Sequence, residues 1–186
     1  MATNQKGKMF IAIFLAFLMI FSIAGIIGSS INSNPSSTTE VYNGFTFTQG
    51  TQGYTTTVND QKASFAFLPR QLEYISTIKP KITGEKVYLS IDPTMNVTAI
   101  DARQRLSTIA RFVGTRPVDA CITEVECPPD LPITACPHDA MVLQFTSGPL
   151  SIREDGPNCY TLQANDELEF YKLAEFISFT SLGILP

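Results

Sequence analysis

Histidine is nearly absent from this sequence, and so are the short motifs that mark common catalytic sites. His138 is the only histidine among the 186 residues, so a Ser-His-Asp triad has a single candidate base without recognisable partners. No G-x-S-x-G, P-loop, G-x-G-x-x-G or H-E-x-x-H motif occurs, and the usual signatures of hydrolases, nucleotide-binding folds and zinc proteases are therefore missing. We expect no cofactor, and the sequence does not establish an enzyme.

Basic residues are too few for a nucleic-acid-binding surface, and they are unevenly spread. Residues 62–116 contain nine basic and four acidic side chains, whereas residues 118–186 contain two basic and eleven acidic ones. Nucleic-acid binding needs a basic footprint, so we expect no nucleic-acid partner. The asymmetry can pair the two halves internally or present an acidic face, but ordinary solvated surface is the simplest interpretation.

Charge is missing altogether from residues 9–28, which read MFIAIFLAFLMIFSIAGIIG. Twenty helical residues at about 1.5 Å each span roughly the 30 Å hydrocarbon core of a bilayer. Lys6 and Lys8 precede the run, and the next charge after it is Glu40. Because positive flanks stay in the cytoplasm, we predict a single-pass protein of the cell membrane: a cytoplasmic flank over 1–8, a transmembrane helix over 9–28, a linker over 29–40 and an exported domain over 41–186.

Two other interpretations of the N-terminus stay open. Ser22 and Ala24 place small residues at the −3 and −1 positions of a signal-peptide cleavage after Ala24. The apolar run is, however, longer than the usual signal core of about 7–15 residues. A pilin-type leader ending at Gly7 is the other alternative, although Lys8 would directly follow the cut and no glutamate occurs early in the helix. An anchor and a signal peptide would both export the domain.

Four cysteines lie in the part predicted to be outside: Cys121, Cys127, Cys136 and Cys159. In an oxidising compartment an even number of cysteines indicates disulfide bonds, and four allow three connectivities. Cys121 and Cys127 flank a short loop, so we pair them with each other, and Cys136 with Cys159. The rival is a zinc site with His138 as a ligand, but no C-x-x-C pair exists and the spacings do not resemble a zinc knuckle or ribbon. We expect two disulfides and no metal.

Alternating side chains predict β-structure from residue 41 onward. The runs 41–49, 54–58 and 63–69, separated by turns at 49–53 and 59–62, predict an antiparallel meander in which Phe45 and Phe47 share one face. Residues 86–91 predict a further strand, and residues 140–145, 150–153 and 159–163 predict a second antiparallel meander. Residues 116–138 contain five prolines, which predict a long irregular loop held by the cysteines. The fold class is therefore α+β, one antiparallel-sheet domain.

The first main helix is predicted over 98–113, after a helical turn or two within 70–75. Thr98 and Asp101 resemble a capping box, and Gly114 ends the helix. Apolar residues spaced three or four apart form one face: Ala102, Leu106, Ile109, Ala110 and Val113. The arginines Arg103, Arg105 and Arg111 lie off that face. Such a cluster can bind phosphate or carboxylate, but we interpret it as a solvated helix face.

The second main helix begins after Asp166, which caps it with Glu169 three residues on. From Phe170 it is apolar on nearly every side, and Glu175 is its last charge. This pattern predicts a central core element. The alternative is an exposed apolar end that docks a partner or the bilayer surface, formed by Phe179, Leu182, Ile184 and Leu185.

Several stretches taken together resemble a known group of proteins. They are YNGFTF at 42–47, FLP at 67–69, YLSIDP at 88–93 before a helix, the cysteines at 121, 127 and 136, and Asn158-Cys159. This set resembles small single-pass exported proteins of archaea whose function has not been assigned. The resemblance covers most of the exported domain and its motifs are structural. It implies the membrane topology and the disulfides, and it carries over no catalytic residue.

The sequence thus predicts a membrane-anchored extracytoplasmic domain that interacts with an envelope protein or takes part in envelope assembly. The bilayer is its other partner, through residues 9–28. The alternatives are an exported enzyme or small-ligand binder, with His138, Arg103 or Asp101 as parts of a scattered site, and a pilin-like subunit. Asn96 begins an N-x-T sequon and is a candidate for glycosylation.

Overall fold

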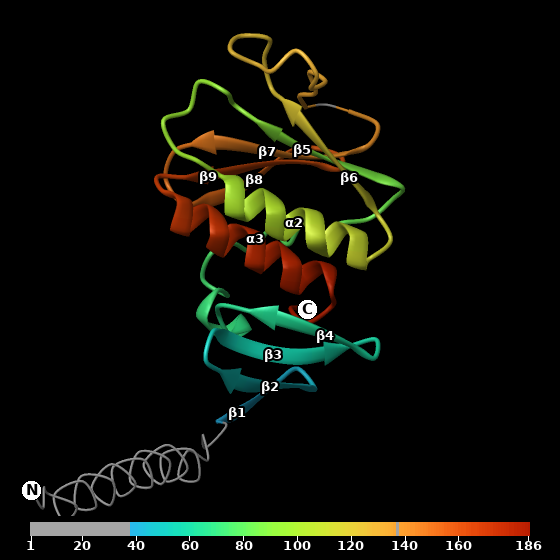
Figure 1. Cartoon of the computed structure of the whole chain (residues 1–186), viewed down its shortest axis with the longest axis vertical. Helices are drawn as coiled ribbons and strands as arrows, with labels where there is room; N and C mark the ends of the chain where they lie inside the picture. The colour runs from blue at the N-terminus through green and yellow to red at the C-terminus, as the bar shows by residue number, and fades with distance from the viewer. Residues whose placement is uncertain (1–37, 137) are drawn as a thin grey trace, which may run out of the picture. The chain divides into compact units, whose positions relative to one another are not determined.

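The first described strands form a four-stranded antiparallel sheet in chain order. The computed structural model describes residues 38–136 and 138–186, of which Thr39–Pro186 form one unit. The strands are β1 (Thr39–Tyr42), β2 (Phe45–Gly50), β3 (Gly53–Val58) and β4 (Gln61–Phe65) (Figure 1). The predicted meander is present with one strand more, and β1 includes Thr39 and Glu40 of the predicted linker.

Two-residue turns explain why this sheet is a set of tight hairpins. Asn43 and Gly44 have φ values of 46° and 82°, and Asn59 and Asp60 have values of 49° and 62°. Positive φ at both central residues is the geometry that matches the twist of two antiparallel strands. The run predicted over 41–49 is therefore two strands, because Asn43 and Gly44 reverse the chain inside it. Gly53 is also required, since a Cβ there would lie 2.2 Å from the carbonyl oxygen of Phe65.

A second sheet of five strands is mixed, so the antiparallel prediction is confirmed for the hairpin of β8 and β9 and wrong for the other pairs. Its strands are β5 (Lys86–Ile91), β6 (Arg116–Cys121), β7 (Met141–Ser147), β8 (Ser151–Gly156) and β9 (Cys159–Ala164), in the order β6-β5-β7-β9-β8. Strands β6, β5, β7 and β9 are parallel, and only β8 runs antiparallel to its neighbour β9. The run of buried residues at the start of β7 (Met-Val-Leu-Gln-Phe) fits a central strand covered on both faces.

Strand β6 corrects the prediction of a continuous loop over 116–138. Arg116–Cys121 pairs along its length with β5 and forms one edge of the sheet. Pro117 is compatible with this position, because an edge strand pairs on one side only and can spare a backbone N–H. The irregular loop is therefore shorter than predicted and follows Cys121.

Two described helices lie side by side against this second sheet (Figure 1). Helix α2 (Ile100–Phe112) connects β5 to β6, and α3 (Glu167–Ser181) follows β9. Helix α2 begins at Ile100 without a side-chain cap, so the predicted capping box at Thr98 is wrong. In α3, by contrast, the Glu169 N–H donates to the Asp166 carboxylate at 2.7 Å, as predicted. The helical segment predicted over 70–75 is a single 3₁₀ turn, η1 (Pro69–Gln71).

Helix α3 is the central core element, as predicted. Near its start, Phe170 packs on Phe145 of β7 with ring centroids 5.7 Å apart. Near its end, Phe179 stacks on Phe65 of β4 at 4.4 Å and meets Phe47 of β2 edge-on at 6.1 Å. The helix therefore contacts both sheets through its apolar side chains, which explains why it is apolar on nearly every side.

The same packing overturns the alternative of an exposed apolar C-terminal end. Phe179 and Ile184 are fully buried, Leu185 is buried and Leu182 is half-buried. These residues fill the space between α3 and the four-stranded sheet instead of facing a partner.

Residues 9–28, predicted to cross the membrane, lie outside the described residues. Within residues 38–136 and 138–186, no helix has the length and apolar character needed to cross a bilayer.

Candidate functional site

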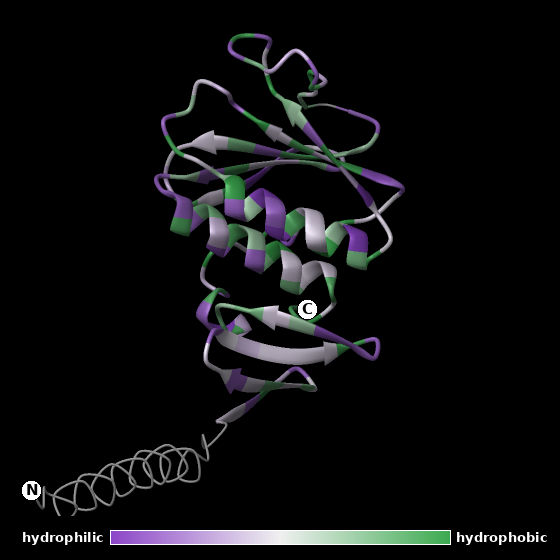
Figure 2. Ribbon diagram, viewed as in Figure 1, coloured by the Kyte–Doolittle hydropathy of each residue, from purple (hydrophilic) through white to green (hydrophobic). Residues whose placement is uncertain are grey.

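A groove follows the outward side of α2, next to strand β6. Its volume is about 450 Å³, and its lining is polar except for one residue: Ile100, Arg103, Gln104, Ser107, Thr108 and Arg111 of α2, with Asp119 of β6. The helix residues recur every three or four positions and so share one side of the helix. The opposite side, with Ala102, Leu106, Ile109 and Ala110, is buried in the core as predicted. Figure 2 shows the hydrophilic residues along α2. We call these seven residues the arginine groove.

Arg103 is held in place by a carboxylate from β6. Its guanidinium contacts Asp119 at 2.7 Å, and its side chain is only 20% exposed. Asp119 is in register with Leu89, whose side chain is buried in the core, so Asp119 also lies on the helix-covered side of the sheet. The Nε atom of Arg103 is buried and lacks a hydrogen-bond acceptor within the described part of the chain.

Arg111 supplies the free charge of the groove. Its side chain is exposed, and among residues 38–136 and 138–186 no carboxylate lies within ion-pair distance of it. It lies in the last turn of α2, where a positive charge is favourable. With Asp119 offsetting one of the two arginines, the groove carries one net positive charge together with hydroxyl and amide donors. Such a surface attracts carboxylate or phosphate groups.

A second, smaller hollow shares a wall with the arginine groove. It has a volume of about 370 Å³ and is lined by Asp101, Gln104, Arg105, Thr108 and Tyr171. Arg105 is mostly buried, with its side chain 13% exposed. The solvated arginine face expected from the sequence is therefore wrong for Arg103 and Arg105, and of the three predicted arginines Arg111 alone is exposed.

Glu175, deep in α3, accounts for the burial of Arg105. The Glu175 side chain is 0% exposed, and its carboxylate lies 3.7 Å from the Arg105 guanidinium. It also accepts hydrogen bonds from the backbone N–H groups of Ala66, at 2.9 and 3.0 Å, and of Phe67, at 2.9 Å. The Arg105 guanidinium stacks over the Phe65 ring at 4.5 Å. One carboxylate thus links α3 to α2 and to the segment that follows β4.

The pKa values of the two groups of this pair shift in opposite directions. Burial raises the pKa of the Glu175 carboxyl above its ordinary value, although the backbone donors and Arg105 oppose the shift. Burial likewise lowers the pKa of the Arg105 guanidinium, and the charge of Glu175 opposes that shift. The spacing of the residues does not reveal this pair, but one signal is present in the sequence: Glu175 is a lone charge in the apolar stretch of residues 173–179.

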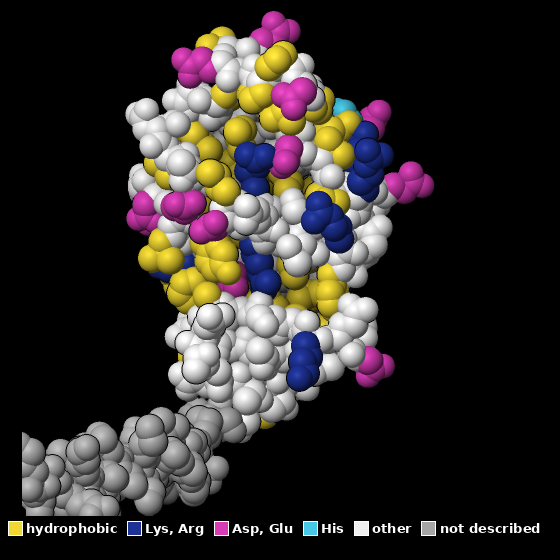
Figure 3. All heavy atoms as spheres, in the orientation of Figure 1, with side chains coloured by type: hydrophobic (Ala, Val, Ile, Leu, Met, Phe, Trp, Pro, Cys, Tyr) yellow, Lys and Arg dark blue, Asp and Glu magenta, His cyan; other side chains and the backbone are white. Residues whose placement is uncertain are grey.

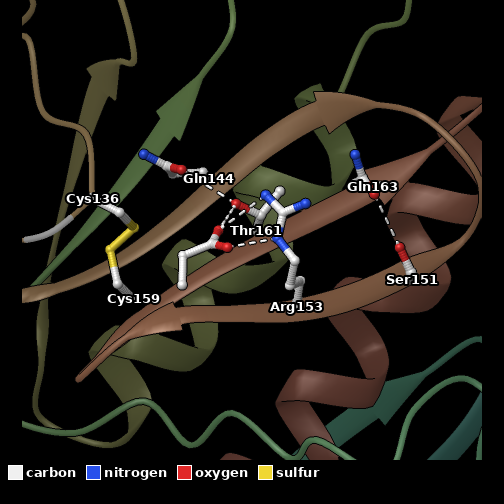
Figure 4. A network of polar contacts seen from close by, with 8 residues as sticks. Cys136, Gln144, Ser151, Arg153, Cys159, Thr161 and Gln163 are labelled. Atoms are coloured by element: carbon white, nitrogen blue, oxygen red, sulfur yellow. Dashed lines mark hydrogen bonds and ion pairs between the residues drawn. A yellow bond between two sulfur atoms is a disulfide. The ribbon is translucent and has the colours of Figure 1, made fainter.

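The face of the five-stranded sheet that lies away from α2 carries a polar row across four strands. Ser90, Gln144, Thr161 and Arg153 are neighbours in the register of β5, β7, β9 and β8. Thr161 donates either to Gln144, at 3.2 Å, or to Asp155, which the Arg153 Nε contacts at 2.5 Å (Figure 4). The hydrogen bond from Arg153, with a smaller contribution from that of Thr161, lowers the pKa of the Asp155 carboxyl. The carboxylate is therefore engaged in joining β8 to β9, which is a structural role.

Both disulfides are present with the predicted connectivity. Cys121 bonds to Cys127 across a Cα–Cα distance of 6.0 Å, and Cys136 bonds to Cys159 across 5.7 Å. They hold the loop of residues 122–136, which we call the disulfide loop. Its path is also fixed by backbone bonds: the Cys121 N–H donates to Pro132 at 3.0 Å, and the Thr134 N–H donates to Cys121 at 2.8 Å. These bonds restrain a loop that has no helix or named strand of its own.

The other predicted site residues lie apart from the arginine groove. His138 is exposed, its Nδ1 accepts from the Ala140 N–H at 3.0 Å, and its ring meets Tyr88 edge-on at 5.0 Å. Tyr88 alternates with the core residues of β5 and so lies on the sheet face away from α2. The structure therefore brings Arg103 and Asp101 to neighbouring hollows but leaves His138 elsewhere. Asn96 is exposed between β5 and α2. Within the described ranges, no cluster of His, Cys, Asp or Glu side chains could hold a metal ion.

Comparison with known proteins adds no relative: no family model, no curated protein and no solved structure matches the chain.

Proposed function

We propose that this protein is a membrane-anchored extracytoplasmic interaction domain that binds an acidic segment of an envelope protein in the arginine groove. The apolar run at 9–28 with its lysine flank supports the anchor and the orientation. Two disulfides support a location outside the cytoplasm, because thiols are kept reduced inside it.

The observation that carries the proposal is the pairing of a fixed arginine with a free one. Asp119 orients Arg103 before any ligand arrives, which lowers the entropic cost of binding. Arg111 has no carboxylate partner within the described residues and can supply one. Between them lie Gln104 and Ser107, which can hydrogen-bond to a backbone.

The length of the groove favours a peptide segment as the occupant. From Ile100 to Arg111 it follows three turns of α2, which is roughly 16 Å at 1.5 Å per residue. An extended peptide covers that length with about five residues. Ile100, 53% exposed at one end, adds an apolar contact that a peptide side chain can cover. A free anion would use only one part of this surface.

Crosslinking from inside the groove tests the proposal. The full chain, carrying a photo-crosslinking amino acid in place of Ser107, is irradiated in its native membranes. We expect a discrete crosslinked protein product, and we expect Arg111→Glu to reduce its yield by about tenfold, since a charge pair turned into a repulsion costs more than 1.4 kcal/mol. Arg116→Glu on the neighbouring strand β6 is the matched control and leaves the yield unchanged.

Other outcomes would overturn this function. If no protein is crosslinked and the groove instead binds a small carboxylate or phosphate, with loss of binding in Arg111→Glu, the chain is a small-ligand binder. If Arg116→Glu and Arg111→Glu reduce the yield equally, the effect is one of overall charge and the groove is not the binding site.

A further inference from the structure

The disulfide loop presents an acidic segment of the kind that the arginine groove fits. Residues 123–126 are all exposed, and within them Glu124 and Glu126 flank Val125, which is 62% exposed. Figure 3 shows acidic side chains around the loop at the top of the view, and both basic and acidic side chains over the helices below it. The segment offers two carboxylates and one apolar side chain. The groove offers the guanidinium of Arg111, that of Arg103 already paired with Asp119, and one exposed apolar side chain, that of Ile100.

The segment is held in one conformation before it binds. The Cys121–Cys127 disulfide closes a ring of seven residues around it. Inside the ring the Cys127 N–H donates to the Glu124 carbonyl at 3.3 Å, and Glu126 has a φ of 59°, which few non-glycine residues adopt. A rigid loop loses little conformational freedom on binding, so more of its contact energy contributes to affinity.

The position of the loop relative to the groove indicates which molecule could occupy the groove. Asp119, which lines the groove, and Cys121, which begins the ring, are two residues apart on β6, so their side chains lie on the same side of the sheet. The acidic segment thus begins two residues after the end of β6, the strand that contributes Asp119 to the groove. Two copies facing each other across a two-fold axis can therefore exchange segments, each groove receiving the segment of the other copy. Closed two-fold pairs of this kind are the commonest assemblies of identical chains.

We propose that the acidic segment bound by the arginine groove is residues 123–126 of a second copy of this chain. The inference rests on the proposed function and names its partner. This contact would use the uneven charge of the sequence, which is net basic over residues 62–116 and net acidic over residues 118–186. The two ranges would contribute complementary charges to the self-association contact.

Isotope mixing distinguishes a second copy from every other occupant. Full-length chains carrying a photo-crosslinking amino acid at Thr123, with Val125 retained, are made in light and heavy-isotope forms, mixed in one membrane preparation and irradiated. We expect crosslinks from position 123 to the peptide of residues 100–111, with light-to-heavy pairs as frequent as random pairing predicts. The same crosslinker at Val125 gives an independent second measurement.

Charge reversal tests whether the contact is the one described. We expect Glu124→Lys with Glu126→Lys, or Arg111→Glu alone, to lower the crosslink yield by about tenfold, which corresponds to about 1.4 kcal/mol. Combining all three changes in one chain restores the yield, because the charges again match. All three side chains are exposed, so the fold tolerates their exchange. Asp130→Lys, also in the disulfide loop and exposed, is the matched control that leaves the yield unchanged.

Three results would overturn the inference: crosslinks within single chains only, crosslinks from position 123 to another protein, or no rescue in the triple variant. If position 107 still crosslinks to another protein in an Arg111-dependent way, the proposed function stands and the self-association falls. If position 107 crosslinks to no protein at all, both fall.

Discussion

At the scale of single residues, Glu175 occupies an environment that carboxylates rarely do. It is completely buried, yet three hydrogen bonds from the backbone of Ala66 and Phe67 and the nearby Arg105 guanidinium compensate its charge. Removing one partner of a buried pair leaves the other charge uncompensated, which costs more than the pair contributes. The residue therefore matters for stability more than any exposed glutamate on the same helix.

This argument gives a prediction for substitution of Glu175. We expect Glu175→Ala to lower the free energy of unfolding by about 3–5 kcal/mol, because Arg105 and two backbone N–H groups lose their partner. Glu167→Ala, an exposed change in the first turn of α3, should cost only about 0.3–1 kcal/mol. Chemical denaturation followed by near-ultraviolet circular dichroism measures both. Equal losses of unfolding free energy in the two variants would show that the buried carboxylate contributes no more to stability than an exposed one.

At the scale of elements, the same carboxylate makes the junction between α3 and β4 sensitive to pH. The pKa of Glu175 is raised above its ordinary 4.5 in the folded state, so folding favours the protonated form. Its contribution to stability is then fully present below pH 4.5 and is lost as the pH rises through the raised pKa. Arg105 on α2 and Tyr171 on α3 also face the group; burial lowers the pKa of Arg105 and raises the pKa of Tyr171.

We therefore expect the unfolding free energy of the native chain to increase, relative to that of Glu175→Gln, as the pH falls through the raised pKa toward 4.5. Denaturation of both proteins over a pH series gives this difference directly. Hydrogen exchange at Ala66 and Phe67 locates it, because their amides bond to the carboxylate. A difference that stays flat, or that changes sign, would contradict the raised pKa. The pKa of Asp155 is lowered, so its contribution to stability is lost as the pH falls below 3.8. This loss is the same in both proteins and cancels in the difference.

Elements whose signals are local could be predicted from the sequence. The apolar face of α2, strand β5 at residues 86–91, the Asp166 cap and the pairing of the four cysteines all depend on residues close in the chain or on a simple count. The direction of β7 against β9 could not be predicted, because it depends on β9 inserting between β7 and β8. Strand β6 could not be predicted, because its proline, Pro117, precedes a loop that is rich in proline and shares its pattern.

The sequence predicts some residues of the candidate site but not the partners that surround them. The sequence indicates Arg103 and Asp101 as possible parts of a site, and the helical spacing places all three arginines off the apolar face. The partners that decide their environment come from elsewhere: Asp119 from β6, and Glu175, whose backbone donor Ala66 is 109 residues away in the chain. Periodicity carries no information about burial by distant segments. For this reason the sequence predicts a solvated face, whereas Arg103 and Arg105 are half-buried in the structure.

At the scale of the whole molecule, the disulfides and the apolar run at 9–28 make one joint prediction. If the run is an anchor with its lysine flank inside, the domain is oxidised and the N-terminus stays attached. We expect the chain isolated from membranes to retain residues 1–28 and to take up a thiol-alkylating reagent only after reduction, at all four cysteines. Intact-mass spectrometry with and without reduction measures both properties in one sample. An N-terminus at Gly25 would instead indicate a cleaved signal peptide, one at Lys8 a pilin-type leader, and alkylation without reduction would place the domain in a reducing compartment.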